Sequence, residues 1–412
     1  ADFTHLWAVF AGLCVFIGLI GLTLIESALA RKEFVRGLLL KNGLQLSIGV
    51  VAYWLLGYGF SVGNDVDNGF IGDEKFGGED WEGTTKYGQA FVYALLGVQT
   101  QFIVNGAISE RTHLLAYLLI SFVNLVFIWP VIVAWGWGGG WLTDVADDAT
   151  FIDYAGSGTI HLFAGSAALA GLLAVKTRLH RYGNQHLVHP FIESNNIRFT
   201  FGTMLYMVAL CVQAGARETT FNNIAAAFWN TWLAGSFCGL LSALILTFKS
   251  RSVSRHFTGV CRGTIAGMVA IAACAANAEG WDAFVIGVAT SPFFAATVWF
   301  VEWMKLDDVD HVLATHLVPG IVGLFAAGLH DNEEGGFHGA EGKTLGVQVL
   351  GIVVIFAWTF VLNGIFYLVL IAAKKIKESD DVQTAGLDFA EVGLQGFTVQ
   401  RIENTIEMPR VN

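Results

Sequence analysis

The chain has 412 residues, of which 54% are hydrophobic and 14% charged, and its formal net charge is −11. Soluble domains carry about 25% charged residues, so this composition excludes an ordinary soluble protein and indicates a membrane protein without a basic patch for nucleic acid. The five cysteines lie in apolar stretches and form no Cys-x-x-Cys spacing, which argues against a zinc site or a disulfide framework.

Apolar stretches of about 20 residues, the length that crosses a bilayer, recur along the whole chain. They predict an all-α membrane protein with eleven transmembrane helices. The expected spans are 6–30, 38–62, 88–108, 112–136, 158–177, 198–216, 224–248, 259–277, 283–303, 311–330 and 346–373. The polar residues of the third span are expected to form hydrogen bonds between helices: Gln99, Gln101 and Asn105. Tryptophans near the end of the fourth span are expected to anchor it at the membrane interface: Trp129, Trp135 and Trp141.

Charges in the predicted loops are unevenly distributed. Loops after odd-numbered spans are basic, as at Arg111, Arg178 and Arg181, whereas loops after even-numbered spans are mostly acidic, as at 144–148. Because positively charged loops remain in the cytoplasm, we expect an outside N-terminus and a cytoplasmic C-terminus in the plasma (inner) membrane. An odd number of spans requires the same arrangement.

One motif occurs twice in the chain. In each copy an Asp stands eight positions before His-Leu, and a Gly and a Leu follow the His at four and eight positions. The first copy is Asp153, His161, Leu162, Gly165 and Leu169, and the second is Asp308, His316, Leu317, Gly320 and Leu324. The two copies lie in the fifth and tenth spans, the last helix of each half, and these spans cross in opposite senses. This indicates an inverted 5+5 repeat, about 6–177 and 198–330, with a substrate site near the midplane; the extra helix is 346–373.

Paired histidines in apolar helices suit several chemistries. Imidazole donates or accepts a hydrogen bond and carries a proton near neutral pH, so a facing pair could hold ammonia or deprotonate ammonium. The rings could instead bind haem or a transition metal, but no carboxylate or thiolate cluster accompanies them. Two unrelated core histidines are the plain alternative, which the duplicated spacing disfavours. Asp153 and Asp308 stand at helix starts and are expected to cap them, and Asp153 could also attract a cation from outside.

Several segments carry a resemblance to a known family. The strongest are ISERTHLLAYLL from Ile108, WGGG from Trp137, the segment from Asp153 to His161, and DDVDHVLATHLVPGIVG from Asp307. LARKEFVRG near the N-terminus and GLDFAEVGL in the tail are weaker. On these segments the chain resembles the Amt/Mep/Rh ammonium transporter family over essentially its whole length. The resemblance implies a homotrimer with one pore per subunit, His161 and His316 as the pore's histidine pair, and Trp137 in the outer vestibule, where an indole face attracts cations.

The predicted pore entrance departs from the family pattern. Leu96 and Val212 stand where bacterial and plant members place two phenylalanines over the pore. Ala216 and Ala209 replace the serine and the second tryptophan of the outer ammonium site. Trp137 is therefore expected to lack its usual hydrogen-bonding and aromatic partners.

The tail departs as well. After Gly386-Leu387-Asp388 the family places His-Gly-Glu, needed for docking across the trimer, whereas this chain has Val392-Gly393-Leu394. Some members are fused through this tail to histidine kinases and sense ammonium. We therefore expect residues 1–373 to form an Amt-type domain, with 374–412 as a cytoplasmic tail or linker leading to a possible signalling domain. The expected function is a non-enzymatic ammonium sensor, without cofactor or metal; a conducting ammonium transporter is the alternative.

Overall fold

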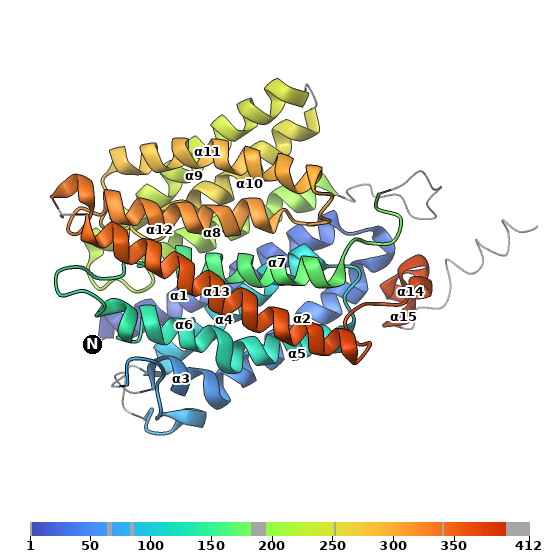
Figure 1. Ribbon diagram of the computed structural model, residues 1–412, viewed down its shortest axis with the longest axis horizontal. Helices are drawn as coiled ribbons and strands as arrows, with labels where there is room; N and C mark the ends of the chain where they lie inside the picture. The colour runs from blue at the N-terminus through green and yellow to red at the C-terminus, as the bar shows by residue number, and fades with distance from the viewer. Residues whose placement is uncertain are drawn as a thin grey trace, which may run out of the picture.

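A computed structural model describes residues 2–63, 68–82, 86–182, 195–250, 253–339 and 342–392. Long helices run side by side between two opposite faces of the molecule (Figure 1). The start of α1 (Asp2–Leu29) lies at one face, here the N-terminal face, and α14 (Asp380–Ala385) and α15 (Leu387–Ala390) lie at the other, the tail face. Within the described ranges there are helices and isolated bridges but no β-strand, and the predicted all-helical membrane fold is confirmed.

Two sets of helices follow one another along the chain. The first consists of α1, α2 (Val35–Ala52), α3 (Tyr58–Val62), α4 (Lys86–Ile108), α5 (Leu114–Val123), α6 (Trp129–Gly136) and α7 (Phe163–Val175). The second consists of α8 (Asn196–Ala214), α9 (Phe221–Ser250), α10 (Val253–Ile271), α11 (Gly280–Trp303), α12 (Val318–His330) and α13 (Lys343–Ala372). Short π-helical segments interrupt or precede some of them: η2 (Tyr53–Gly57), η4 (Asn124–Ile128), η6 (Ser157–Leu162) and η7 (Leu313–Leu317). Single 3-10 turns are η1 (Lys32–Phe34), η3 (Phe76–Gly78), η5 (Trp141–Thr143) and η8 (Gly336–His338).

The predicted spans agree with the helices. Among the described residues, 10 helical stretches are long and apolar enough to cross a membrane, and each coincides with a predicted span. The remaining predicted span, 259–277, coincides with α10, whose apolar part, Phe257–Ile271, is shorter. The count of eleven and the orientation of the termini stay predictions.

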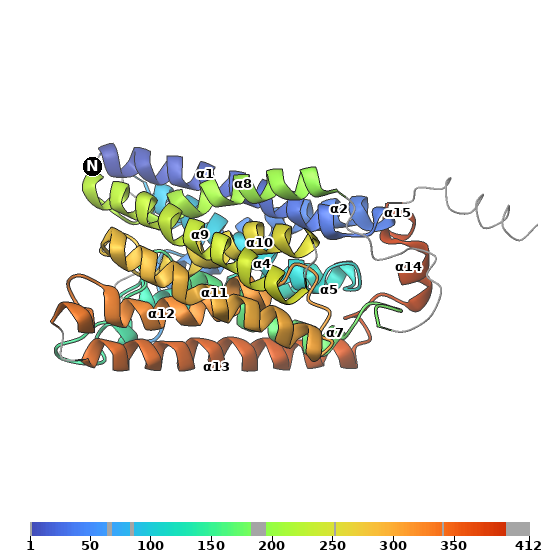
Figure 2. The ribbon, with the colours of Figure 1, turned by 90° about the horizontal axis from the view of Figure 1, so that it is seen from above.

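The histidine-bearing segments lie where helices of both sets meet. Figure 2 shows α1 beside α8 at one edge of the molecule and α13 along the opposite edge. Between these edges α12 packs against η6, and α7 packs against η7. Each histidine segment therefore contacts the helix that continues the other one.

The tryptophans at the end of the fourth span are not all interfacial. Trp129 is completely buried, and its Nε1 donates a 2.9 Å hydrogen bond to the Thr159 carbonyl. Trp135 is also buried and packs against Trp141 and Trp358. The prediction of membrane-interface anchors is wrong for Trp129 and Trp135, because the helices gather around them rather than leaving them at the lipid surface.

The first part of the tail folds back onto the membrane domain. Leu387 is fully buried against Ala30, Phe34 and Leu38, and the Gly37 amide donates to the Asp388 carboxylate at 2.9 Å. The two weaker family-like segments of the sequence thus contact one another. Residues 393–412, including Gly393 and Leu394 of the altered motif, lie outside the described residues.

Candidate functional site

Aspartates begin both histidine segments. The Asp153 carboxylate accepts hydrogen bonds from the Gly158 and Thr159 amides at 3.1 and 2.7 Å, at the start of η6. The Asp308 carboxylate accepts from the Val312 and Leu313 amides, both at 2.9 Å, at the start of η7. Burial raises the pKa of Asp308 to about 6, while its amide donors act in the opposite direction. Both predicted caps are thus present.

The glycines of the repeated motif let the two segments cross closely. A Cβ added to Gly165 would lie 2.5 Å from the Leu317 Cα, and one added to Gly320 would lie 2.8 Å from the Leu162 nitrogen. The glycine of each copy therefore packs on the leucine that follows the histidine of the other copy. This reciprocal contact explains the shared His-Leu-x-x-Gly spacing, because only the absence of a side chain permits such an approach.

The crossing brings the two imidazoles together. The Nδ1 atoms of His161 and His316 are 3.2 Å apart, and their rings are nearly parallel, with centroids 5.1 Å apart. Both histidines are buried, and the Tyr206 ring lies edge-on to His316 at 6.1 Å. The two motif copies thus form one site.

A chain of glutamines fixes the protons around the pair. Gln213 in α8 accepts from the Gln99 amide at 2.9 Å and donates to the Ala155 carbonyl at 2.9 Å, which determines the orientation of its own amide. Its Nε2 also lies 3.4 Å from His161 Nε2, so that nitrogen acts as the acceptor. A neutral His161 then carries its proton on Nδ1 and donates it to His316 Nδ1, leaving the His316 proton on Nε2.

Gln213 was missed by the sequence analysis, which expected Gln99 only to bond between helices. That expectation is confirmed, since Gln99 bonds Gln213 and also lies 3.2 Å from the Tyr206 hydroxyl. The available signal was a single glutamine within the apolar stretch of α8.

Trp137 lies at the N-terminal face, just after α6. Its Nε1 donates to the Asp153 carbonyl at 2.7 Å, and Tyr93 packs beside it with ring centroids 5.6 Å apart. The Arg217 guanidinium lies over the indole, with Cζ 4.6 Å from the ring centroid. The Asp153 carboxylate itself is engaged in capping η6, so the part of Asp153 that adjoins Trp137 is its carbonyl oxygen.

The residues of the altered entrance lie on two helices. Leu96 in α4 and Val212 in α8 are both buried. Ala216 follows α8, half-buried and adjacent in sequence to Arg217. Ala209 faces α1: a Cβ added to Gly18 of α1 would lie 2.5 Å from the Cβ of Ala209.

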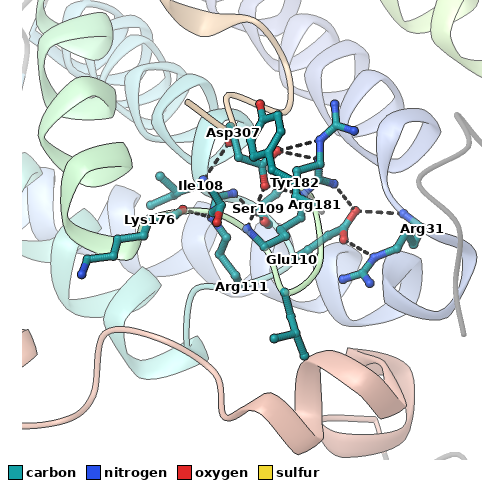
Figure 3. A network of polar contacts seen from close by, with 12 residues as sticks. Arg31, Ile108, Ser109, Glu110, Arg111, Lys176, Arg181, Tyr182 and Asp307 are labelled. Carbon is teal, nitrogen blue, oxygen red and sulfur yellow. Dashed lines mark hydrogen bonds and ion pairs between the residues drawn. The ribbon is translucent and has the colours of Figure 1, made fainter. Parts of the chain in front are cut away.

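A buried ion-pair network lies at the tail face (Figure 3). Glu110, in the turn that follows α4, pairs with Arg31 at 2.6 Å and with Arg178 at 2.8 Å. Arg178 also holds both oxygens of Asp307 at 2.8 Å, and Arg111 donates to the Asp307 carbonyl at 2.8 Å. Burial would raise the pKa of Asp307, but Arg178 keeps it well below its ordinary value.

A polar cavity of about 110 Å³ adjoins this network. Its lining is predominantly basic: Leu29, Arg31, Arg178, Arg181, Arg262, Asp308, Val309 and His311. Over the described ranges, no group of three or more histidines, cysteines or acidic residues is arranged to hold a metal ion.

Comparison with known proteins identifies the family. The profile described as Ammonium Transporter Family matches residues 6–397. The chain belongs to this family. Its relatives include "Ammonium transporter Amt2" of Archaeoglobus fulgidus, 29% identical over 93% of this chain and 86% of the relative. "Ammonium transporter 1 member 1" of Arabidopsis thaliana is 28% identical over 88% and 79%, respectively.

Solved structures agree with this assignment. The structure titled "Sensor Amt Protein" superposes with a TM-score of 0.86 at 25% identity, covering 95% of this chain and 98% of that one. Mep2 of Saccharomyces cerevisiae gives a TM-score of 0.80 at 23% identity over 92% and 89% of the two chains, which supports the shared fold. This ammonium transporter family member is an integral membrane protein of a transport family rather than an enzyme.

Proposed function

We propose that this protein is an ammonium sensor that binds its ligand at the His161–His316 pair and transmits binding to its cytoplasmic tail. The observation that carries the proposal is the ion-pair network at the tail face. It joins the ends of both histidine-bearing elements to the loop on which the tail docks.

The connections can be followed residue by residue. Arg178 follows α7, the helix that continues from His161, and Asp307 precedes the Asp308 cap of the segment that carries His316. Arg111 binds the Asp307 carbonyl through its side chain, and its own carbonyl accepts the Glu378 amide of the tail at 2.8 Å. A change in the separation of the two histidine segments would therefore strain the contact that holds the tail.

A ligand must favour one conformation over another to act as a signal. Ammonia placed at the histidine pair would have to accept or donate a hydrogen bond where the 3.2 Å contact now lies. Opening that contact separates the segments that cross at Gly165 and Gly320. We propose this separation as the conformational change, with Trp137 receiving ammonium at an external N-terminal face in the plasma membrane. A homotrimer is the assembly we propose.

The neighbour titled as a sensor, at 25% identity over nearly the whole length, supports the sensing assignment. Conduction of ammonium, or of ammonia plus a proton, is the second candidate. The relatives named as ammonium transporters favour it, together with the paired histidines.

The test combines tail movement with transport. Spin labels at Arg36→Cys on α2 and Thr384→Cys on α14 are both at exposed positions, while the described native cysteines are buried. We expect ammonium, but not sodium, to change the distance between the labels in reconstituted protein. His161→Ala and His316→Ala should abolish the change, and His330→Ala, which alters a histidine bonded to Asp282 instead, should retain it.

Electrical recording on the same reconstituted protein separates the two candidates. We expect little or no ammonium current, because Leu96, Val212 and Ala216 provide no aromatic or hydroxyl group to capture and dehydrate a cation. Saturable, ammonium-specific currents together with an unmoved tail would favour the transporter and refute the sensor.

A further inference from the structure

The face of Trp137 already has a cation on it. The Arg217 guanidinium carbon is 4.6 Å from the indole centroid, within the roughly 6 Å of a cation–π contact. The indole is held in place by its hydrogen bond to the Asp153 carbonyl and by Tyr93. An external cation that approached this face of the ring would meet the Arg217 side chain.

We propose that Arg217 is a built-in occupant of the cation site on Trp137, which an incoming monovalent ammonium-type cation must displace. The inference rests on the proposed function for the nature of the ligand, and it adds the residue that controls access to the outer site. Arg217 would lower the affinity of the ring for cations and set a threshold concentration for entry.

The contacts of Arg217 are those of a displaceable group. Its Nη1 lies 3.4 Å from the Asp153 carbonyl and 3.3 Å from the Tyr154 carbonyl, both longer than the usual 2.9–3.0 Å. Within the described part of the chain no carboxylate forms an ion pair with it. The Asp153 carboxylate is turned toward the Thr159 amide and hydroxyl, each at 2.7 Å. The aromatic face is thus the main partner of the guanidinium of a half-buried arginine.

Displacement has a simple quantitative consequence. A ligand that binds only when the ring is free sees an affinity reduced by the fraction of time for which the ring is free. If Arg217 leaves the ring about one-tenth of the time, its removal should raise cation affinity roughly tenfold. Loss of like-charge repulsion acts in the same direction.

Fluorine NMR of protein labelled with 5-fluorotryptophan can observe this ring directly, with Trp137→Phe identifying its resonance. The probe is methylammonium chloride, titrated against sodium chloride at equal ionic strength. We expect Arg217→Met and Arg217→Gln to shift the Trp137 resonance in the absence of probe, and to lower the half-saturating methylammonium concentration roughly tenfold. Lys343→Gln is the matched control. It removes a cation at the same face of the molecule, but this cation is paired with the Asp148 carboxylate at 2.6 Å. It should titrate like the unmodified protein.

Identical titrations for the unmodified protein and both Arg217 variants would overturn the proposal, and so would an equal gain of affinity in Lys343→Gln. Repeating the titration in His161→Ala separates this inference from the sensing mechanism. In that variant, a Trp137 response that still depends on Arg217 supports the Arg217 proposal, while a tail that still moves with ammonium refutes sensing through the pair.

Discussion

Gln213 determines the direction of the hydrogen bonds around the histidine pair. Its oxygen is occupied by Gln99, so its nitrogen faces both the Ala155 carbonyl and His161. Because the amide can act only as a donor toward His161, the proton between the two rings is assigned to His161 Nδ1. Between the two rings, His161 Nδ1 is therefore the hydrogen-bond donor and His316 Nδ1 the acceptor.

Replacing Gln213 with leucine should release this arrangement. The variant removes the donor to His161 Nε2, so both tautomers of His161 become populated and ammonium affinity falls about fivefold, the equivalent of one net hydrogen bond of about 1 kcal/mol. Nitrogen chemical shifts of labelled histidine report the tautomers, and calorimetry gives the affinity. Gln101→Leu is the control, since Gln101 is equally buried but bonds Asn124 and Thr100. An unchanged His161 tautomer in Gln213→Leu would contradict the assignment.

The sequence revealed the functional role of a single residue only where that residue belonged to the repeated motif. His161, His316 and the capping aspartates were found because the motif occurs twice with the same spacing. Gln213 and Arg217 occur once, and each acts on a partner from another segment, which spacing along the chain does not reveal. The sequence did hold a weak signal for Arg217. This arginine follows an even-numbered span, where the loops are mostly acidic, and it is adjacent in sequence to Ala216 of the altered outer site.

At the scale of elements, the close crossing of the two histidine segments determines the geometry of the pair. Each crossing glycine would place a Cβ against main-chain atoms, which cannot move without shifting the segment. The sequence predicted the helices but not their π-helical turns η6 and η7, because the hydrophobic pattern does not distinguish one extra residue per turn.

Adding a methyl group at the crossing should therefore separate the histidines. We expect Gly165→Ala and Gly320→Ala each to destabilise the protein by about 1–3 kcal/mol, the usual cost of overpacking, and to weaken ammonium binding. Thermal unfolding in detergent and calorimetry provide the two measurements. Gly364→Ala in α13 has open space around the new methyl and should be neutral or slightly stabilising. Equal effects at all three glycines would show that the crossing has no special role.

At the scale of the whole molecule, the tail is held at the tail face by contacts of different kinds. Leu387 supplies an apolar contact, the Glu378 amide a backbone bond to Arg111, and the Glu391 carboxyl group a polar contact with Lys41 Nζ at 3.1 Å. The sequence predicted a tail or linker from residue 374 but not this docking. Docking depends on small turns that bring distant segments into contact. One of them is at Gly386, which has φ +98° and packs closely against Glu33.

The acidic part of this contact should make docking sensitive to pH. Burial, together with the neighbouring Glu378 carboxylate, raises the pKa of Glu391 from 4.5 to about 7, although Lys41 opposes the rise. The docked tail therefore holds this proton more tightly than a released tail does. Docking is strongest below about pH 4.5 and weakens as the pH rises through about 7.

Spin labels at Arg36→Cys and Thr384→Cys should report the weaker docking of the tail: we expect a longer distance between the two labels at pH 8 than at pH 5. Glu391→Gln, which keeps the shape of the side chain but cannot ionise, should stay docked at both values. His113 also faces this cluster, and burial and Lys41 lower its pKa. His113→Asn, which preserves a capping side chain at the start of α5, should retain the pH dependence if Glu391 is its source. A response that persists in Glu391→Gln and disappears in His113→Asn would assign the titration to the histidine instead.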